Sequence, residues 1–235
     1  MINEQNPKNA NEEEQLKKSV EIRFNELIKK PEIKEALNMF DNNEILSNFK
    51  YHNKNHTLDV IKETILFALA DETNPDVLEK QVIAAAWHDV GYSEDIGDHE
   101  AFSVKLFEQS EAYKTLSEVN KKEIANSILD TKIYLENGSP SFSRTSSALG
   151  YVLDADVSNF GRDDFFEKRA QIAEELGVEW DNLKERKKFL KFTIYLLKKH
   201  DWKTQSARRL RQETKEKNLA LMVEEYNQLV EQLKK

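Results

Sequence analysis

The chain has 235 residues, a formal net charge of −8, and charged side chains at one third of its positions. An acidic chain repels nucleic-acid phosphates on average, so a nucleic acid is not an expected partner. The absence of cysteine excludes disulfides, thiolate nucleophiles and cysteine-ligated zinc, so any metal must be held by nitrogen and oxygen.

The abundance of Leu, Glu, Lys and Ala, with only six glycines and four prolines, favours long helices over strands and tight turns. We therefore expect an all-α fold. The first 15 residues lack the features of a targeting signal, and no run approaches the roughly 18 apolar residues of a membrane span. We expect a cytoplasmic protein without a membrane partner. The oligomeric state stays open, a homo-oligomer included.

In chain order, we expect a disordered tail over residues 1–11 and then a single helical domain over 12–235. Apolar residues at helical spacing predict helices at 12–30, 32–40, 55–70, 77–89, 99–109, 116–129 and 147–159. Residues 91–98 and 136–147 are expected to be loops, the second a candidate lid. About three further helices are expected after residue 163, and the apolar stripe of the last, 218–235, is typical of core or dimer contact.

The dipeptide His88-Asp89 follows directly on the apolar run of residues 82–87. Burying an imidazole and a carboxylate without partners costs several kcal/mol, and a divalent metal is the obvious partner. Adjacent helical residues point about 100° apart, so a shared ion needs further ligands from other helices. His56 can supply one of these ligands, and Asp156 can supply another.

Three segments of the chain carry these residues in the order His, His-Asp, Asp, and two further segments lie between the second and the third. The five segments read YHNKNH, AAAWHDVGY, DHEAFS, ILDTK and LDADVSNFG, over about residues 50–161. Together they resemble the HD superfamily of metal-dependent phosphohydrolases, in particular its small single-domain bacterial members. The resemblance implies a compact multi-helix HD-like bundle with helical N- and C-terminal extensions, the latter over residues 162–235.

The expected metal ligands are His56, His88, Asp89 and Asp156. Asp154 and Asp156 lie about 200° apart on a helix, so at most one of them faces the ion, and the resemblance favours Asp156. Two imidazoles and two carboxylates suit Mn²⁺ or a similar ion, with Mg²⁺, Fe²⁺, Co²⁺, Ni²⁺ and Zn²⁺ as alternatives.

A divalent ion with open positions activates water and polarises a phosphoryl oxygen. The usual Ser-nucleophile and P-loop signatures are absent from the sequence. We therefore expect hydrolysis, by metal-activated water, of a phosphoester or phosphoanhydride bond in a small phosphorylated metabolite such as a nucleotide. Two alternatives stay open: a non-catalytic nucleotide-binding or regulatory HD module, and a helical interaction protein in which the polar residues are incidental.

Three residues are the catalytic candidates. Asp89 is one of them as a metal ligand, and Glu100 can orient the attacking water or act as a general base. The alternative for Glu100 is an acidic side chain that stabilises the first turn of a helix. Lys132 can bind phosphate charge. Related proteins often carry His two residues after this Lys, where this chain has Tyr134.

Substrate contacts are expected from His52, His99, Lys132, Arg144 and Arg162, although either arginine can equally be a surface cation. His99 is also a candidate for a further metal-associated group. The second His-Asp dipeptide, His200-Asp201, lies among lysines with no apolar run before it, and we interpret it as a solvated helix end.

Overall fold

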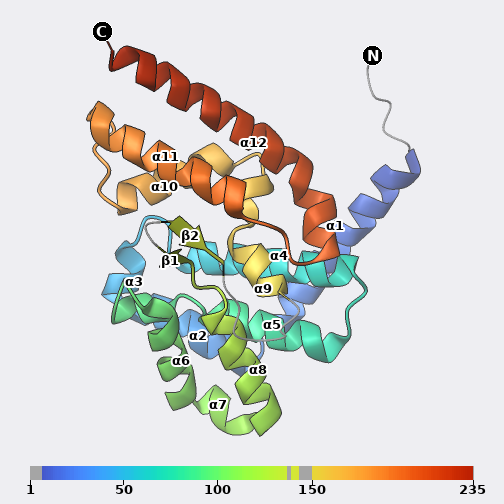
Figure 1. Cartoon of the computed structure of the whole chain (residues 1–235). Coiled ribbons are helices and arrows are strands. Elements are labelled where there is room, and N and C mark those ends of the chain that lie inside the picture. Colours follow the sequence, from blue (N-terminus) through green and yellow to red (C-terminus); the bar gives the residue numbers. More distant parts are fainter. Residues whose placement is uncertain (1–6, 137–138, 143–149, 235) are drawn as a thin grey trace.

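The computed structural model describes residues 7–136, 139–142 and 150–234, and it confirms the expected all-α class (Figure 1). Within those ranges the chain forms helices joined by two short 3-10 turns, with one small hairpin as the only strand pair. The α-helices are α1 Pro7–Leu27, α2 Pro31–Asn42, α3 Glu44–Asn48, α4 Lys54–Ala70, α5 Pro75–Trp87, α6 His99–Gln109, α7 Glu111–Thr115, α8 Glu118–Leu129, α9 Tyr151–Asp156, α10 Phe165–Glu175, α11 Leu183–Lys199 and α12 Gln205–Gln232.

Helix α1 begins at Pro7, five residues before the expected start, and residues 1–6 of the expected tail lie outside the described residues. Pro31 lies at the first position of α2, where its missing N–H costs nothing. Ile33, Leu37 and Phe40 then repeat at helical spacing and are buried.

Helices α4 and α5 form the centre of the molecule, with α1, α2, α8 and α9 packed around them (Figure 1). Every residue of α5 from Gln81 to Trp87 is buried, as the apolar run predicted. The Trp87 indole N–H donates to the backbone carbonyl of Glu32 at 2.9 Å and so fixes the end of α5 against α2. This anchoring matters because His88 and Asp89 follow at once.

Two expected elements differ in the structure. The expected helix 116–129 begins two residues later, at Glu118, because the Ser117 hydroxyl accepts a hydrogen bond from the Asn120 N–H and caps α8; the short helix α7 before it was not expected. Part of the expected loop 136–147 is a hairpin, in which β1 (Tyr134–Glu136) pairs antiparallel with β2 (Ser139–Ser141). The other residues of that candidate lid lie outside the described residues, apart from Phe142.

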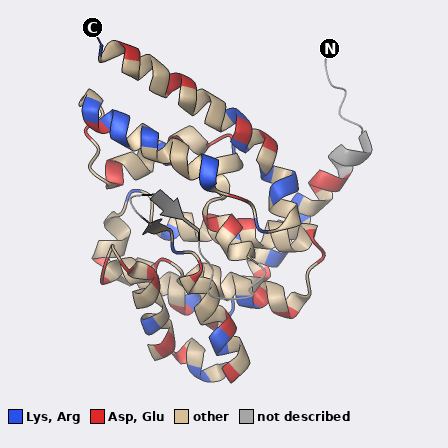
Figure 2. Cartoon of the chain, viewed as in Figure 1, with Lys and Arg blue, Asp and Glu red and all other residues tan. Residues whose placement is uncertain are grey.

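The last third of the chain folds as α10, α11 and α12, and α12 lies along the outside of α11 (Figure 1). Lys and Arg alternate with Asp and Glu along these outer helices (Figure 2). The 3-10 turn η2 (Ser158–Gly161) passes so close to α12 that a Cβ on Gly161 would lie 2.3 Å from the Arg211 carbonyl. No helix in the described ranges combines the length and the apolar character that crossing a bilayer requires.

The prediction that His200 is a solvated helix end was wrong in one respect. His200 does follow the last residue of α11, but its side chain is buried, with ring centroids of Phe160 at 5.4 Å and Trp202 at 4.3 Å. The Lys215 ammonium of α12 lies 3.0 Å from its Nδ1. Burial and the positive charge of Lys215 lower the pKa of His200 to about 3. Only the return of α12 over this turn, distant in sequence, buries the ring.

Candidate metal centre

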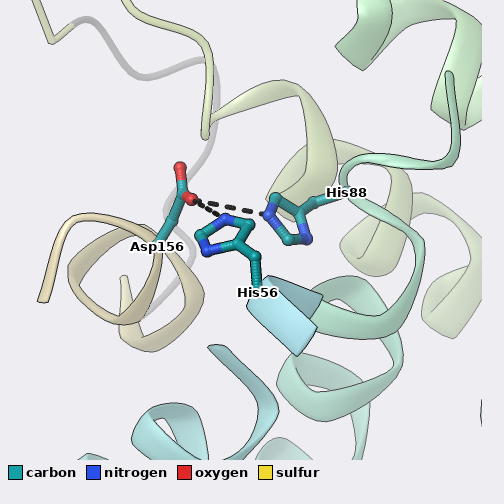
Figure 3. A group of neighbouring side chains, drawn as sticks. All are labelled: His56, His88 and Asp156. Atoms are coloured by element: carbon teal, nitrogen blue, oxygen red, sulfur yellow. Dashed lines mark hydrogen bonds and ion pairs between the residues drawn. The ribbon is translucent and has the colours of Figure 1, made fainter. Parts of the chain in front are cut away.

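Four side chains from three regions of the fold converge at one point. His56 lies in the first turn of α4, His88 and Asp89 follow α5, and Asp156 is the last residue of α9. Figure 3 shows His56, His88 and Asp156 pointing toward one another from these separate segments. The side chains of His56 and Asp156, which lie 100 positions apart in the sequence, therefore meet as predicted.

The position of His56 follows from the residues just before it. The Asn53 side chain accepts hydrogen bonds from the N–H groups of Asn55 and His56 and so starts α4 at Lys54. The Tyr51 ring packs against the His56 ring with centroids 4.5 Å apart. His56 is therefore held in the first turn with Nε2 directed at the cluster.

The sequence interpretation placed His88 and Asp89 within the helix 77–89, but in the structure they lie beyond the end of that helix. α5 ends at Trp87, and the backbone turns at Asp89 into the 3-10 turn η1 (Val90–Ser93). His88 lies at the end of α5, where its Nδ1–H donates to the Ala85 carbonyl at 2.8 Å. That bond selects the tautomer whose Nε2 lone pair faces the cluster.

The turn after Asp89 is fixed by a hydroxyl from α6. Ser103 Oγ donates to the His88 carbonyl at 2.7 Å and accepts from the Gly91 N–H at 2.9 Å. A Cβ on Gly91 would lie 1.9 Å from the His99 carbonyl, so only glycine allows α6 to approach this closely. The close approach brings His99 and Glu100 to the same site.

Four of the distances among the converging donor atoms suit a shared ion. His56 Nε2 lies 3.1 Å from Asp156 Oδ1 and 3.4 Å from Asp89 Oδ2. His88 Nε2 lies 3.1 Å from Asp89 Oδ2 and 3.4 Å from Asp156 Oδ1. Ligand bonds of about 2.1 Å place neighbouring donor atoms about 3.0 Å apart in an octahedron and about 3.4 Å apart in a tetrahedron.

Two of these donor atoms are buried without any hydrogen-bond partner of acceptable geometry among the described residues: His88 Nε2 and Asp89 Oδ2. Although they lie 3.1 Å apart, their angles do not make a hydrogen bond. Leaving buried polar atoms unpaired is costly. A cation between them satisfies both atoms.

The charges also favour a cation. Burial raises the pKa of the Asp89 and Asp156 carboxyls, but the imidazoles of His56 and His88 outweigh it and hold both pKa values well below the usual range. Both carboxyls are therefore ionised at neutral pH. The two carboxylates in turn raise the pKa of His88. Two negative charges beside imidazoles, whose protons a bound metal would displace, form a site for a divalent ion of the kind that nitrogen and oxygen ligands hold.

Asp154 has a different function from Asp156, as expected. Its carboxylate is buried and accepts hydrogen bonds from the N–H of Lys203 at 2.9 Å, the N–H of Thr204 at 2.7 Å and the Thr204 hydroxyl at 2.8 Å. Asp154 therefore ties the start of α12 to α9, whereas the Asp156 side chain remains 20 % exposed and faces the cluster.

The other catalytic candidates lie beside the cluster. His99 Nε2 is 3.7 Å from Asp89 Oδ1 and 3.3 Å from Glu100 Oε1. Glu100 is buried, and its Oε2 has no hydrogen-bond partner in the described part of the chain. Burial raises the pKa of its carboxyl. Lys132 lies 3.8 Å from Glu100 Oε2 and donates to Asp98, and this bond raises the pKa of its ammonium.

His52 is held by a residue that the sequence did not single out. Glu175, the last residue of α10, binds the His52 ring at Nδ1 and accepts from the backbone N–H groups of Tyr51 at 2.7 Å and His52 at 3.0 Å. Burial lowers the pKa of His52, but the bond to Glu175 outweighs it, so the pKa is raised overall. No local signal marks Glu175, because it lies 123 positions from His52.

Tyr92 connects the two flanking histidines. Its ring stacks on His52, with centroids 4.4 Å apart, and on His99, with centroids 3.8 Å apart. Tyr92 belongs to the segment AAAWHDVGY, so the sequence placed it near the site without suggesting this stacking. The stack keeps both imidazoles at the edge of the cluster.

A cavity of about 410 Å³ opens onto this site. Its polar lining comprises His52, Asp89, Tyr92, His99, Glu100, Lys132 and Asp156, among others. His52, His99 and Lys132 were all expected at the substrate. Small-molecule pockets in proteins commonly measure about 300–1,000 Å³, so this one can hold a small metabolite.

Arg162, one of the two arginines expected at the substrate, is not among the residues that line this cavity. The Arg162 guanidinium binds Asp59 at 2.8 Å and Asp164 at 2.9 Å, and it lines two other surface hollows. It therefore ties η2 to α4 and α10 instead of facing the metal centre. Arg144 lies outside the described residues.

Comparison with known proteins gives no relative: no family model, no curated protein and no solved structure matches the chain. The chemistry of the site therefore rests on the residues and distances above.

Proposed function

We propose that this protein is a metal-dependent phosphohydrolase, which cleaves a phosphoester or phosphoanhydride bond of a small phosphorylated metabolite such as a nucleotide. The observation that carries the proposal is the convergence of His56, His88 and Asp156, with Asp89 Oδ2 at 3.1–3.4 Å from both imidazoles, beside a cavity that Glu100 and Lys132 also line. The resemblance to the HD superfamily agrees with this proposal.

A divalent ion held by His56, His88, Asp89 and Asp156 would supply a water of lowered pKa and polarise a phosphoryl oxygen. The flanking residues have separate roles. Lys132 binds a phosphate oxygen, and its ammonium stays charged because Asp98 and Glu100 lie beside it. Glu100, whose pKa is raised by burial, accepts a proton from the attacking water.

His52 is suited to protonate the departing oxygen. Its Nδ1 is bound by Glu175, so its Nε2 carries the proton available to the substrate. The raised pKa favours the protonated form of the ring. An acid and a base held on separate elements around one cavity provide both proton transfers that a hydrolysis requires.

The test uses protein stripped with a chelator and reloaded with Mn²⁺, Mg²⁺, Fe²⁺, Co²⁺, Ni²⁺ or Zn²⁺. Release of phosphate or of the leaving alcohol is then measured with nucleotides, p-nitrophenyl phosphate and bis-p-nitrophenyl phosphate. We expect turnover that needs metal and falls by at least 100-fold in Asp89→Asn, since this change removes a ligand. Asp201→Asn is the matched control, because it makes the same change at the exposed carboxylate of the second His-Asp dipeptide, outside the cavity.

Turnover that survives in Asp89→Asn would contradict the proposed site. Tight nucleotide binding without turnover under every metal would instead support a regulatory binding module. Neither binding nor turnover would leave a helical interaction protein as the better interpretation.

A further inference from the structure

The lining of the cavity is of two chemical kinds. The metal ligands and the acid-base candidates make one part. The other part is apolar and comes largely from the C-terminal helices. It includes Ile172 of α10, Leu176 directly after α10, Phe192 and Leu196 of α11, and Ile96 of the loop before α6.

These apolar side chains are unusually exposed. Of the eight large hydrophobic residues exposed in the described part of the chain, three line this one cavity: Ile96 at 64 %, Leu176 at 62 % and Phe192 at 37 %. Single exposed apolar residues are common, but a group of them around a polar centre is typical of a ligand site. The group suits the apolar part of a substrate.

Positive charge is scarce in the same cavity. Among the described residues that line it, Lys132 is the only lysine or arginine, and its ammonium already contacts Asp98 and Glu100. Three carboxylates, Asp89, Glu100 and Asp156, line it as well. A divalent ion offsets Asp89 and Asp156 alone, so little positive charge is left for a chain of phosphates.

Building on the proposed function, we infer that the substrate carries a single phosphate esterified to an alcohol of about nucleoside size whose rings present apolar faces. The phosphate lies against the metal centre and Lys132. The rings lie against Phe192, Leu196 and Leu176, which determine the specificity for this class. A nucleoside monophosphate fits this description and a nucleoside triphosphate does not.

The first experiment compares metal-loaded wild-type protein with Phe192→Ala and Leu196→Ala, using 1-naphthyl phosphate and glycerol phosphate. We expect kcat/KM for 1-naphthyl phosphate to fall about 10-fold in each variant, mainly through KM, and to change less than about twofold for glycerol phosphate. Leu221→Ala, an exposed leucine on α12 outside the cavity, is the matched control and leaves both substrates unaffected. Wild-type protein should also prefer AMP to ATP by at least about 10-fold in kcat/KM.

A second readout does not depend on turnover. Binding of 1-naphthylphosphonate, which cannot be hydrolysed at its carbon–phosphorus bond, is measured by calorimetry, and we expect Kd to rise about 10-fold in Phe192→Ala. If the phosphonate binds in this way but no ester is hydrolysed, the proposed function fails and the ligand class stands. If esters are hydrolysed but ATP is preferred, or both variants affect glycerol phosphate and naphthyl phosphate equally, the ligand class is wrong and the hydrolase stands. If the phosphonate binds wild-type and variant proteins equally, the apolar wall has no role in recognition.

Discussion

The same substitution at Asp154 and Asp156, two positions apart on α9, should have opposite consequences. Asp156 faces the histidines of the metal centre, whereas Asp154 accepts hydrogen bonds from Lys203 and Thr204. Asp156→Asn should therefore abolish metal binding with little loss of stability in the metal-free protein. Asp154→Asn should destabilise the protein and leave metal binding intact.

The magnitudes follow from the contacts. An ion at 100 times its Kd stabilises the folded state by about 2.7 kcal/mol, which raises the Tm of a chain of this size by roughly 5–11 °C. An amide at position 154 retains one acceptor oxygen but directs an NH₂ group at backbone N–H donors. Losing charge-assisted bonds to a buried carboxylate costs about 3 kcal/mol, which lowers Tm by roughly 6–12 °C.

Calorimetry of wild type and both variants, with chelator and with Mn²⁺, measures both quantities, and elemental analysis gives the bound metal. In wild-type and Asp154→Asn protein the metal should raise Tm by similar amounts. In Asp156→Asn the metal-induced rise should vanish, and the metal-free Tm should fall by less than in Asp154→Asn. A metal-induced rise that persists in Asp156→Asn and disappears in Asp154→Asn would reverse the assignment of the ligand.

Three further predictions concern the surroundings of the centre. Glu175→Gln removes the group that raises the pKa of His52, so the high-pH limb of the kcat profile should move to lower pH; an unmoved limb would exclude His52 as the acid. Gly91→Ala places a Cβ 1.9 Å from the His99 carbonyl, so it should lower the free energy of unfolding by at least about 2 kcal/mol and weaken metal binding. Gly177→Ala is the control: at φ +66° with open space around it, it should lower the free energy of unfolding by about 1 kcal/mol and leave metal binding unchanged. Denaturant titration measures both free energies. Burial and Lys215 lower the pKa of His200 to about 3, so the ring is neutral in the folded protein, whereas the unfolded chain protonates it below pH 6.5. Its contribution to stability is therefore fully present above pH 6.5. That contribution is lost as pH falls toward 3, by up to about 1.4 kcal/mol per pH unit. His200→Gln should flatten that part of the stability profile, and an unchanged slope between pH 6.5 and 4 would show that the ring is accessible to protons.

Local sequence determined much of the fold and of the candidate ligand set. The apolar run before His88 predicted a buried helix that ends next to the His88 and Asp89 side chains, and the structure has this helix as α5, with the Trp87 indole bonded to α2. Asn53 placed His56 in the first turn of its helix, because an asparagine at this position satisfies free backbone N–H groups. Such signals lie within a few residues of what they determine, so they can be interpreted from one sequence.

The tertiary structure decided what depends on distant segments. His200 looked solvated because its neighbours in sequence are charged, yet α12 folds back and buries it against Trp202. Glu175 binds His52 across 123 positions, and α10 and α11 supply the apolar wall of the cavity. No periodicity or motif records such contacts, because they arise when helices pack and bring together side chains that have no relation along the chain.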